Sequence, residues 1–151
     1  MKLPIEAKGI PNLDEIGLLS IRYQSFKQSN SATNEFILDE NSITTHLVKD
    51  EAIEDIPTAW LKLYLLSLRY FKPNELNLDN IFSVLPNLAW TNKGPIRPEK
   101  LKGPLSDESL QIHALDKFPP MTNFVIPDEV RIADTSRVRL GAYLGKGTTI
   151  M

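Results

Sequence analysis

The chain has 151 residues, of which 42% are hydrophobic and 24% charged, and its formal net charge is −2 at pH 7. This balance is typical of a globular protein with one domain, or with a small domain and an attached segment. The near-neutral charge argues against nucleic-acid binding, and no apolar stretch reaches the roughly 18 residues that a membrane-spanning helix needs. The chain has no cysteine, which excludes disulfides and thiolate metal sites and is compatible with the cytoplasm.

The first third of the chain favours β structure. Residues 15–38 contain an apolar–polar alternation, then a polar loop at residues 28–31 and a short apolar stretch at residues 36–38, which together predict a hairpin. The alternation places three apolar residues on one face: Leu19, Ile21 and Tyr23. Asn41 and Ser42 are good capping residues, so a short helix is expected from there to about residue 49.

A helix over about residues 58–70 is the strongest predicted element. Pro57 suits its first turn, where a missing N–H costs nothing, and Pro73 cannot continue it. Lys62 and Arg69 are its polar positions. A wide apolar face, expected to be buried, follows the 3/4 spacing: Trp60, Leu61, Leu63, Tyr64, Leu65, Leu66 and Leu68. Further along, the sequence predicts a short helix at 79–85, a strand at 88–90 and a loop at 93–109.

A six-residue rhythm dominates the last part of the chain. Aliphatic residues recur at strict intervals of six: Ile126, Ile132, Val138, Leu144 and Ile150. Four residues after each of the first four stands a small or β-branched residue: Val130, Ser136, Ala142 and Thr148. This period fits neither a helix nor an ordinary strand, and it is typical of a parallel β-helix. The alternative is two ordinary strands joined by turns.

The rhythm makes a structural prediction that can be checked residue by residue. If three hexads form one triangular coil, each residue stacks on the one 18 positions later, so that Ile150 lies over Ile132 and Leu144 over Ile126. The predicted fold class is α+β, with a small N-terminal α/β domain at residues 1–120 and the start of a left-handed parallel β-helix at residues 121–151.

Few residues suggest chemistry. His46 and His113 are 67 positions apart and show no metal-binding spacing, so exposed or structural roles are expected and no metal site is predicted. Residues 145–148 superficially resemble a phosphate loop but lack its upstream glycine, and a turn is expected there. Of three arginines in the hexads, Arg137 and Arg139 are the candidate site residues. They are expected to bind a substrate carboxylate or, with more weight, to lie in a subunit interface or simply in solvent.

Two blocks of sequence resemble a known family. One runs from Ala59 to Ser67 and from Leu85 to Asn92. The other includes Leu115–Met121, Pro127–Tyr143 and Gly147–Met151. Together they resemble tetrahydrodipicolinate N-succinyltransferase, over roughly residues 57–151.

The resemblance implies a trimeric acyltransferase of diaminopimelate and lysine biosynthesis. Such an enzyme moves a succinyl group from succinyl-CoA, its co-substrate, to the amine of L-2-amino-6-oxopimelate. The family's β-helix continues for many coils beyond the position that matches Met151, and its CoA groove and catalytic carboxylates lie in those coils. We therefore expect no catalytic or cofactor-binding residue in this chain, and expect the chain by itself to be inactive.

Two other functions remain open. Residues 1–118 would suit a non-catalytic module that organises a trimer or binds a partner. A different hexapeptide-repeat enzyme, such as a sugar acyltransferase or a γ-type carbonic anhydrase, is a further alternative. Those enzymes usually carry histidines in their coils, and residues 126–151 contain none.

Overall fold

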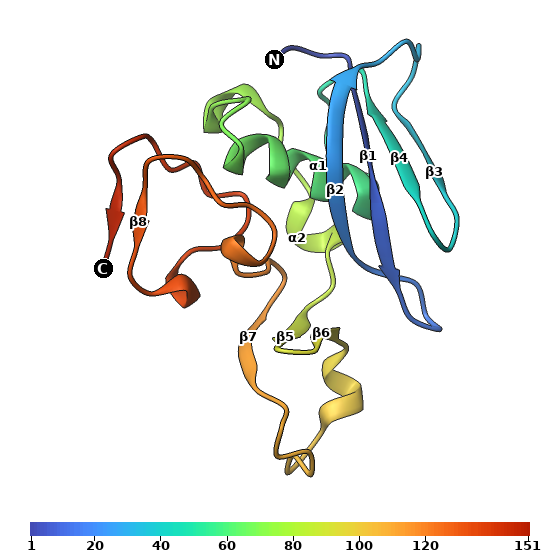
Figure 1. The fold of residues 1–151 in the computed structure, drawn as a ribbon. Helices are drawn as coiled ribbons and strands as arrows, with labels where there is room; N and C mark the ends of the chain where they lie inside the picture. Colours follow the sequence, from blue (N-terminus) through green and yellow to red (C-terminus); the bar gives the residue numbers. More distant parts are fainter.

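The structure is a computed structural model that describes residues 1–151. A four-stranded antiparallel sheet, a central helix and an irregular C-terminal segment follow one another in space, with helix α1 (Ile56–Ser67) in the middle (Figure 1). The sheet has the order β2-β1-β4-β3. Its strands are β1 (Ile5–Leu13), β2 (Leu18–Gln28), β3 (Glu35–Leu38) and β4 (Ile43–Leu47). The longest helix, α1, has 12 residues, and the structure contains no helix that qualifies as a membrane span.

Two predictions for this region were wrong. Strand β2 pairs with β1, and β3 pairs with β4, so β2 and β3 do not form the expected hairpin. Residues 43–47 form strand β4, not a helix, and its buried residues alternate along the strand. Asn41 and Ser42 instead donate their backbone N–H groups to the Asp39 carboxylate and form the turn between β3 and β4. Residues that cap helices also form turns. The alternation of buried residues in β4 shows that this segment is a strand that follows such a turn.

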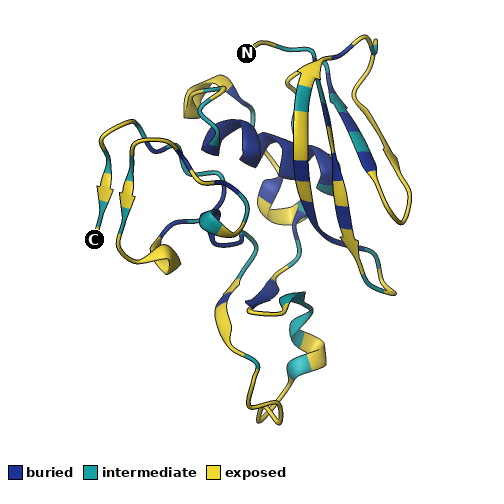
Figure 2. Cartoon of the chain, in the orientation of Figure 1, coloured by how far each residue is buried: buried dark blue, intermediate teal, exposed yellow.

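The central helix was predicted correctly. The Asp55 side chain accepts a hydrogen bond from the Thr58 backbone N–H at 2.7 Å and caps the helix start. Every residue of α1 after Ile56 is buried, as the continuous dark blue of the helix in Figure 2 shows. Tyr64 ties the helix to the sheet, because its hydroxyl donates to the Ile21 carbonyl at 2.9 Å and accepts from the Tyr23 N–H at 3.2 Å. Burial raises the pKa of Tyr64 to about 12.

Lys62 lies inside the protein, although it is one of the helix's two polar positions. Its side chain is fully buried, and its ammonium contacts the Asp50 carboxylate at 2.9 Å. It also donates to the carbonyls of Glu51 and Asn77, at 2.7 and 2.6 Å. A buried ammonium is tolerated only when it is paired and fully hydrogen-bonded. Lys62 therefore joins two loops to the helix.

Arg69 connects the end of α1 to the C-terminal segment. Its backbone has a positive φ of 62°, and Tyr70 N–H returns to the Leu65 carbonyl at 2.9 Å in a Schellman-type helix end. Glycine usually occupies this position. An arginine occupies it here, and its side chain donates hydrogen bonds to the carbonyls of Asp128 and Leu144.

A second, smaller sheet lies below the helix in Figure 1. It has the order β6-β5-β7 and is antiparallel. The predicted helix at 79–85 and strand at 88–90 are confirmed, and two short elements occur in the predicted loop at 93–109. The elements of this region are the 3₁₀ turn Pro73–Glu75, α2 (Ile81–Val84), β5 (Leu88–Thr91), β6 (Gly94–Ile96), the 3₁₀ turn Pro98–Leu101 and β7 (Ile112–Asp116).

The C-terminal segment contains one parallel strand pair. Strands β8 (Arg131–Ile132) and β9 (Thr149–Ile150) pair in parallel, with Ile132 opposite Ile150. Three hydrogen bonds make the ladder continuous. The Gly147 N–H donates to the Glu129 carbonyl at 2.7 Å, the Arg131 N–H to the Thr148 carbonyl at 2.9 Å, and the Ala133 N–H to the Ile150 carbonyl at 2.8 Å. The predicted 18-residue stacking is confirmed at this pair. Residues 145–148 form a turn before β9, as expected. Two further 3₁₀ turns cover Met121–Asn123 and Thr135–Arg137.

The hexad pattern does not hold at every position. Val138 and Leu144 are buried, and Ile132 and Ile150 are half-buried, but Ile126 is 76% exposed and faces no core. Its neighbour Val125, at the end of a 3₁₀ turn, fills the core in its place. Ser136 is also exposed rather than turned inward; its N–H and hydroxyl contact the Asp134 carboxylate.

One core of 27 buried residues runs through the protein. It includes side chains from both sides of residue 120, such as Trp60 before it and Met121, Val138 and Leu140 after it. The division into domains at 1–120 and 121–151 stays a prediction. The two parts share this core.

Gly141 allows the C-terminal segment to approach α1. Its φ is +104°, and a Cβ atom there would lie 2.5 Å from Leu63 Cδ2. Ser67 fixes the contact, because its hydroxyl accepts from Gly141 N–H at 2.8 Å and donates to the Ala142 carbonyl at 3.1 Å.

Replacing Gly141 with alanine is expected to lower the free energy of unfolding by about 1–3 kcal/mol, because the backbone would be strained and Leu63 displaced. Urea denaturation of the purified chain measures this. Gly145→Ala is the matched control, since a Cβ there meets nothing within 4 Å. Equal stability of the two variants would contradict the close approach.

Candidate functional site

The two arginines predicted as site residues occupy different environments. Arg139 is half-buried; its Nε lies 3.0 Å from Asp116 Oδ2, and Nη1 donates to the Ser136 carbonyl at 2.6 Å. The Arg137 side chain is 68% exposed, with Nε 3.5 Å from Asp134 Oδ2. The structure therefore engages Arg139 in holding β7 against the C-terminal segment, and leaves Arg137 at the surface.

Arg139 also borders an apolar cavity of about 720 Å³. Helix α2 forms one wall, and the loop that contains Leu140 and Gly141 forms another. Phe82 and Phe118 pack at its side with ring centroids 5.4 Å apart and ring planes tilted by 57°, and Phe82 is 65% exposed. The candidate arginine thus combines a fixed guanidinium with an apolar neighbourhood. A role in substrate binding or in a subunit interface stays a prediction for both arginines.

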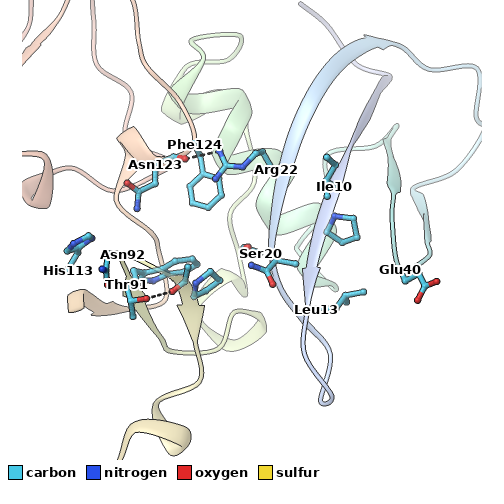
Figure 3. Close-up of a pocket in the computed structure, with 15 residues that line it drawn as sticks. Ile10, Leu13, Ser20, Arg22, Glu40, Thr91, Asn92, His113, Asn123 and Phe124 are labelled. Atoms are coloured by element: carbon cyan, nitrogen blue, oxygen red, sulfur yellow. Dashed lines mark hydrogen bonds between the residues drawn. The ribbon is translucent and has the colours of Figure 1, made fainter. Parts of the chain in front are cut away.

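The larger cavity lies between the four-stranded sheet and the small sheet (Figure 3). Its volume is about 1110 Å³, ample for a small organic molecule. Strands β1 and β2 form one side, β5, β6 and β7 the other, and the turn at Asn123 and Phe124 closes one end. The sequence reasoning did not anticipate this site, because its walls come from segments far apart in the chain.

Arg22 is the cation of this cavity. Its Nη1 donates to the Asn123 carbonyl at 2.8 Å, and the guanidinium lies 4.6 Å from the centre of the Phe124 ring, as Figure 3 shows. The structure contains no ion pair to Arg22. The alternation of β2 signals an outward-facing residue here, but it does not reveal the aromatic ring over which Arg22 lies.

The polar groups around Arg22 fall into two classes. Asn92 and Thr91 are engaged within the protein: Asn92 binds the backbone of Ser109 and Gln111, and Thr91 donates to the Gly94 carbonyl. In contrast, the side chains of Asn12, Asn123 and His113 line the cavity and form no hydrogen bond to another residue in the structure. The cavity therefore offers free donors for a ligand.

The two histidines lie on different sheets. His46, on β4, has Nδ1 2.8 Å from Ser29 Oγ and Nε2 3.7 Å from the Glu6 carboxylate. That environment fits the structural role expected for it. His113, on β7, faces the cavity. No three histidine, cysteine, aspartate or glutamate side chains gather in a way that would hold a metal ion. The cavity that His113 faces is suited to binding, and among its lining residues no nucleophile is hydrogen-bonded to a base.

Asp14 lies in the β1–β2 turn, next to the lining residue Leu13. Its carboxylate accepts from the N–H groups of Ile16 and Gly17 in the β1–β2 turn, and Arg97 Nε lies 2.8 Å from it. Lys100 adds a contact at 3.4 Å. The hydrogen bond from Arg97 holds the pKa of Asp14 well below its usual range. This cluster fixes the β1–β2 turn to the segment after β6.

Replacing Asp14 with asparagine is expected to lower the free energy of unfolding at pH 7 and to flatten its fall in acid. A carboxylate whose pKa is lowered by folding stabilises above its unfolded pKa, near 4, and loses that contribution as the pH falls toward the folded pKa. The difference from the parent chain should therefore be constant between pH 5 and 8 and shrink below about pH 4. Urea denaturation at several pH values measures it.

Asp128→Asn is the control, because the Asp128 side chain takes part in no ion pair or hydrogen bond in the structure; its backbone carbonyl alone is used. A stability difference for Asp14→Asn that persists undiminished at pH 2.5 would contradict the ionic role of Asp14.

Comparison with known proteins shows which proteins this chain is similar to. Residues 85–119 match the family profile described as the middle region of tetrahydrodipicolinate N-succinyltransferase. A Pseudomonas putida 2,3,4,5-tetrahydropyridine-2,6-dicarboxylate N-succinyltransferase is 50% identical over 114 residues, which are 72% of this chain and 33% of that protein. The protein of that name from Salinispora tropica is 49% identical over 106 residues, covering 67% of this chain and 33% of the relative. Over the shared residues, the chain is similar to tetrahydrodipicolinate N-succinyltransferases.

A solved structure has the same fold as this chain over the chain's whole length. The crystal structure of a 2,3,4,5-tetrahydropyridine-2-carboxylate N-succinyltransferase from Campylobacter jejuni superposes with a TM-score of 0.85 and 22% identity, covering 100% of this chain and 57% of that one. The chain spans about a third of the length of the curated relatives that it matches.

Proposed function

We propose that this chain is the N-terminal region of an enzyme that succinylates L-2-amino-6-oxopimelate, the ring-opened form of tetrahydrodipicolinate, in lysine and diaminopimelate biosynthesis. The donor is succinyl-CoA: the amine attacks the thioester carbonyl, an amide bond forms, the C–S bond breaks and CoA leaves as the thiol. The observation that carries this proposal is the 50% identity to the Pseudomonas putida succinyltransferase over 114 residues.

The role of this region in the proposed enzyme is to support and begin the catalytic scaffold. The cavity around Arg22 holds no nucleophile hydrogen-bonded to a base, and the relatives are about three times as long as the segment that they share with this chain. The chemistry is accordingly assigned to the part of the relatives that has no counterpart here, and the chain alone is proposed to be inactive. Arg137 and Arg139 are proposed to face a neighbouring subunit or a substrate carboxylate at the edge of this region.

The C-terminal segment is proposed to be the first coil of a left-handed parallel β-helix. The parallel ladder between β8 and β9, with its 18-residue offset, supports this proposal. Burial of Val138 and Leu144 supports it as well, since both are inward positions of the hexads. A homotrimer in the cytoplasm, where acyl-CoA donors are available, completes the proposal.

If β8 and β9 form a stable ladder, the amide protons of Arg131 and Ala133 should exchange slowly with solvent, because each donates to a β9-region carbonyl. We expect protection of at least tenfold relative to the backbone N–H of Lys146, in the preceding turn, for which the structure shows no hydrogen bond. Hydrogen exchange followed by NMR measures this. Equal exchange at the three sites would contradict the ladder.

A chimeric enzyme tests the proposed function. The matching third of the Pseudomonas putida protein is replaced with this chain, and release of CoA thiol is followed with a thiol reagent. The absence of cysteine in this chain keeps its own background at zero. We expect substrate-dependent CoA release by the chimera and none by the chain alone. Turnover by the chain alone, or a folded chimera without activity, would overturn the assignment.

The same preparation separates the other candidate function. A trimer-organising or partner-binding module would form larger assemblies in light scattering as the concentration of the chain is raised. The activity of a chimera would then be the same whether this region came from this chain or from the Pseudomonas putida protein.

A further inference from the structure

The side chains that line the cavity around Arg22 define the chemistry of a ligand. We propose that this cavity binds a small organic carboxylate with an apolar body. The proposal rests on the cavity alone and not on the proposed function.

The charge of the cavity comes from Arg22. Its guanidinium has five N–H donors, of which the structure engages one, in the bond to the Asn123 carbonyl. No carboxylate of the protein pairs with it. A guanidinium with a free edge binds a carboxylate through two parallel hydrogen bonds, a geometry that a point charge does not reproduce.

Arg22 is already held in place for such a ligand. The Phe124 ring lies under its guanidinium at 4.6 Å, and the carbonyl bond fixes the direction of the fork. The loss of entropy on ordering a long side chain normally opposes binding. Arg22 is already ordered by its contacts within the protein, so a ligand does not have to order it. In Figure 3 the guanidinium reaches from β2 across to the Asn123–Phe124 turn at the end of the cavity.

The remaining walls select the rest of the ligand. Asn12, Asn123 and His113 present side chains that have no partner within the protein, and they can hydrogen-bond a second polar group or a carboxylate oxygen. Ile10 and Leu13 line the same cavity while 49% and 37% exposed. A ligand that covers them removes apolar surface from water. An inorganic anion would use Arg22 and leave these side chains uncovered.

Glu40 is the one carboxylate among the cavity's lining residues. It comes from the β3–β4 turn and lies on the far side of β1 from Arg22 in Figure 3. Repulsion of an anion at Arg22 by this residue is therefore screened by water and weak.

The test is an NMR titration of the ¹⁵N-labelled chain with three probes. Hexanoate carries both a carboxylate and an apolar body, hexanamide lacks the charge, and inorganic phosphate lacks the apolar body. We expect saturable shifts of the signals of Arg22, His113 and Asn123 with hexanoate at up to about 10 mM. Hexanamide and phosphate should bind at least about tenfold more weakly.

Two variants locate the effect. Arg22→Gln should weaken hexanoate binding about tenfold or more, and Arg22→Lys should restore only part of it, because lysine keeps the charge but not the fork. Arg131→Gln is the matched control: it removes an exposed arginine outside the cavity and should leave hexanoate binding unchanged. The proposal is overturned by an absence of saturable shifts, by equal binding of phosphate, or by unchanged binding in Arg22→Gln.

Discussion

Replacing Lys62 with alanine is expected to lower the free energy of unfolding by about 3–5 kcal/mol, the usual cost of breaking a buried ion pair from one side. The lysine side chain is fully buried and Asp50 is 28% exposed. Without the ammonium, the Asp50 carboxylate loses its counter-charge, and the carbonyls of Glu51 and Asn77 lose their donor. Chemical denaturation followed by tryptophan fluorescence measures the loss.

Two further variants make this result specific. Lys146→Ala removes an exposed lysine that forms no ion pair in the structure and should change the stability by less than about 0.5 kcal/mol. Lys62→Met keeps most of the side-chain volume and should still be destabilised, since the carbonyls of Glu51 and Asn77 lose their donor and the Asp50 carboxylate loses its counter-charge. A Lys62→Met variant as stable as the parent chain would show that volume alone matters at this position.

Replacing Trp60 with alanine is expected to cost about 3–5 kcal/mol, because a large side chain leaves a cavity that the core cannot refill. Trp60 is 1% exposed. Its ring centroid lies 5.1 Å from that of Phe124 and 6.0 Å from that of Trp90, so it joins α1 to both the small sheet and the C-terminal segment. Calorimetric melting and urea denaturation both report the loss.

Phe82→Ala is the matched control for this aromatic deletion. Phe82 is 65% exposed and contacts Phe118 at the surface, so its removal should cost about 1 kcal/mol or less. Comparable destabilisation by the two substitutions would contradict the central position assigned to Trp60.

Local patterns predicted the elements whose signals are local. Helix α1 follows from the placement of Pro57 and from apolar residues at helical spacing, and both are visible within 12 residues of sequence. The burial of Lys62 cannot be seen in the sequence of the helix, because its partners are residues 50, 51 and 77. Strand β4 was missed because Asn41 and Ser42 can begin a helix or form a turn, and the neighbouring strands decide between the two.

The hexad rhythm was informative about pairing and less so about burial. It predicted that Ile150 lies opposite Ile132, and the parallel ladder confirms this. It also predicted an inward Ile126, which is 76% exposed. A 3₁₀ turn at Met121–Asn123 shifts the chain so that Val125 becomes the buried residue. The period of the repeat thus predicts which residues pair across the coil. Whether the first hexad residue is buried depends on the path of the chain before the repeat.

The cavity around Arg22 was beyond the reach of sequence patterns. Arg22 and Asn123, whose contact closes one end of it, are 101 positions apart. The sequence directed attention to Arg137 and Arg139 because they lie within the recognisable repeat. The structure shows Arg139 in an ion pair with Asp116 and Arg22 in none.

We propose that β8 and β9 begin a coil that is a working part of a succinyltransferase. The most direct test is the rate of CoA release by the chimera that carries this chain, measured beside two single variants of it. Ile132→Asp places a charge in the half-buried strand pair and should abolish turnover, whereas Ile126→Asp changes an exposed hexad position and should retain it. Equal rates for the two variants, or no turnover by the folded parent chimera, would contradict the claim.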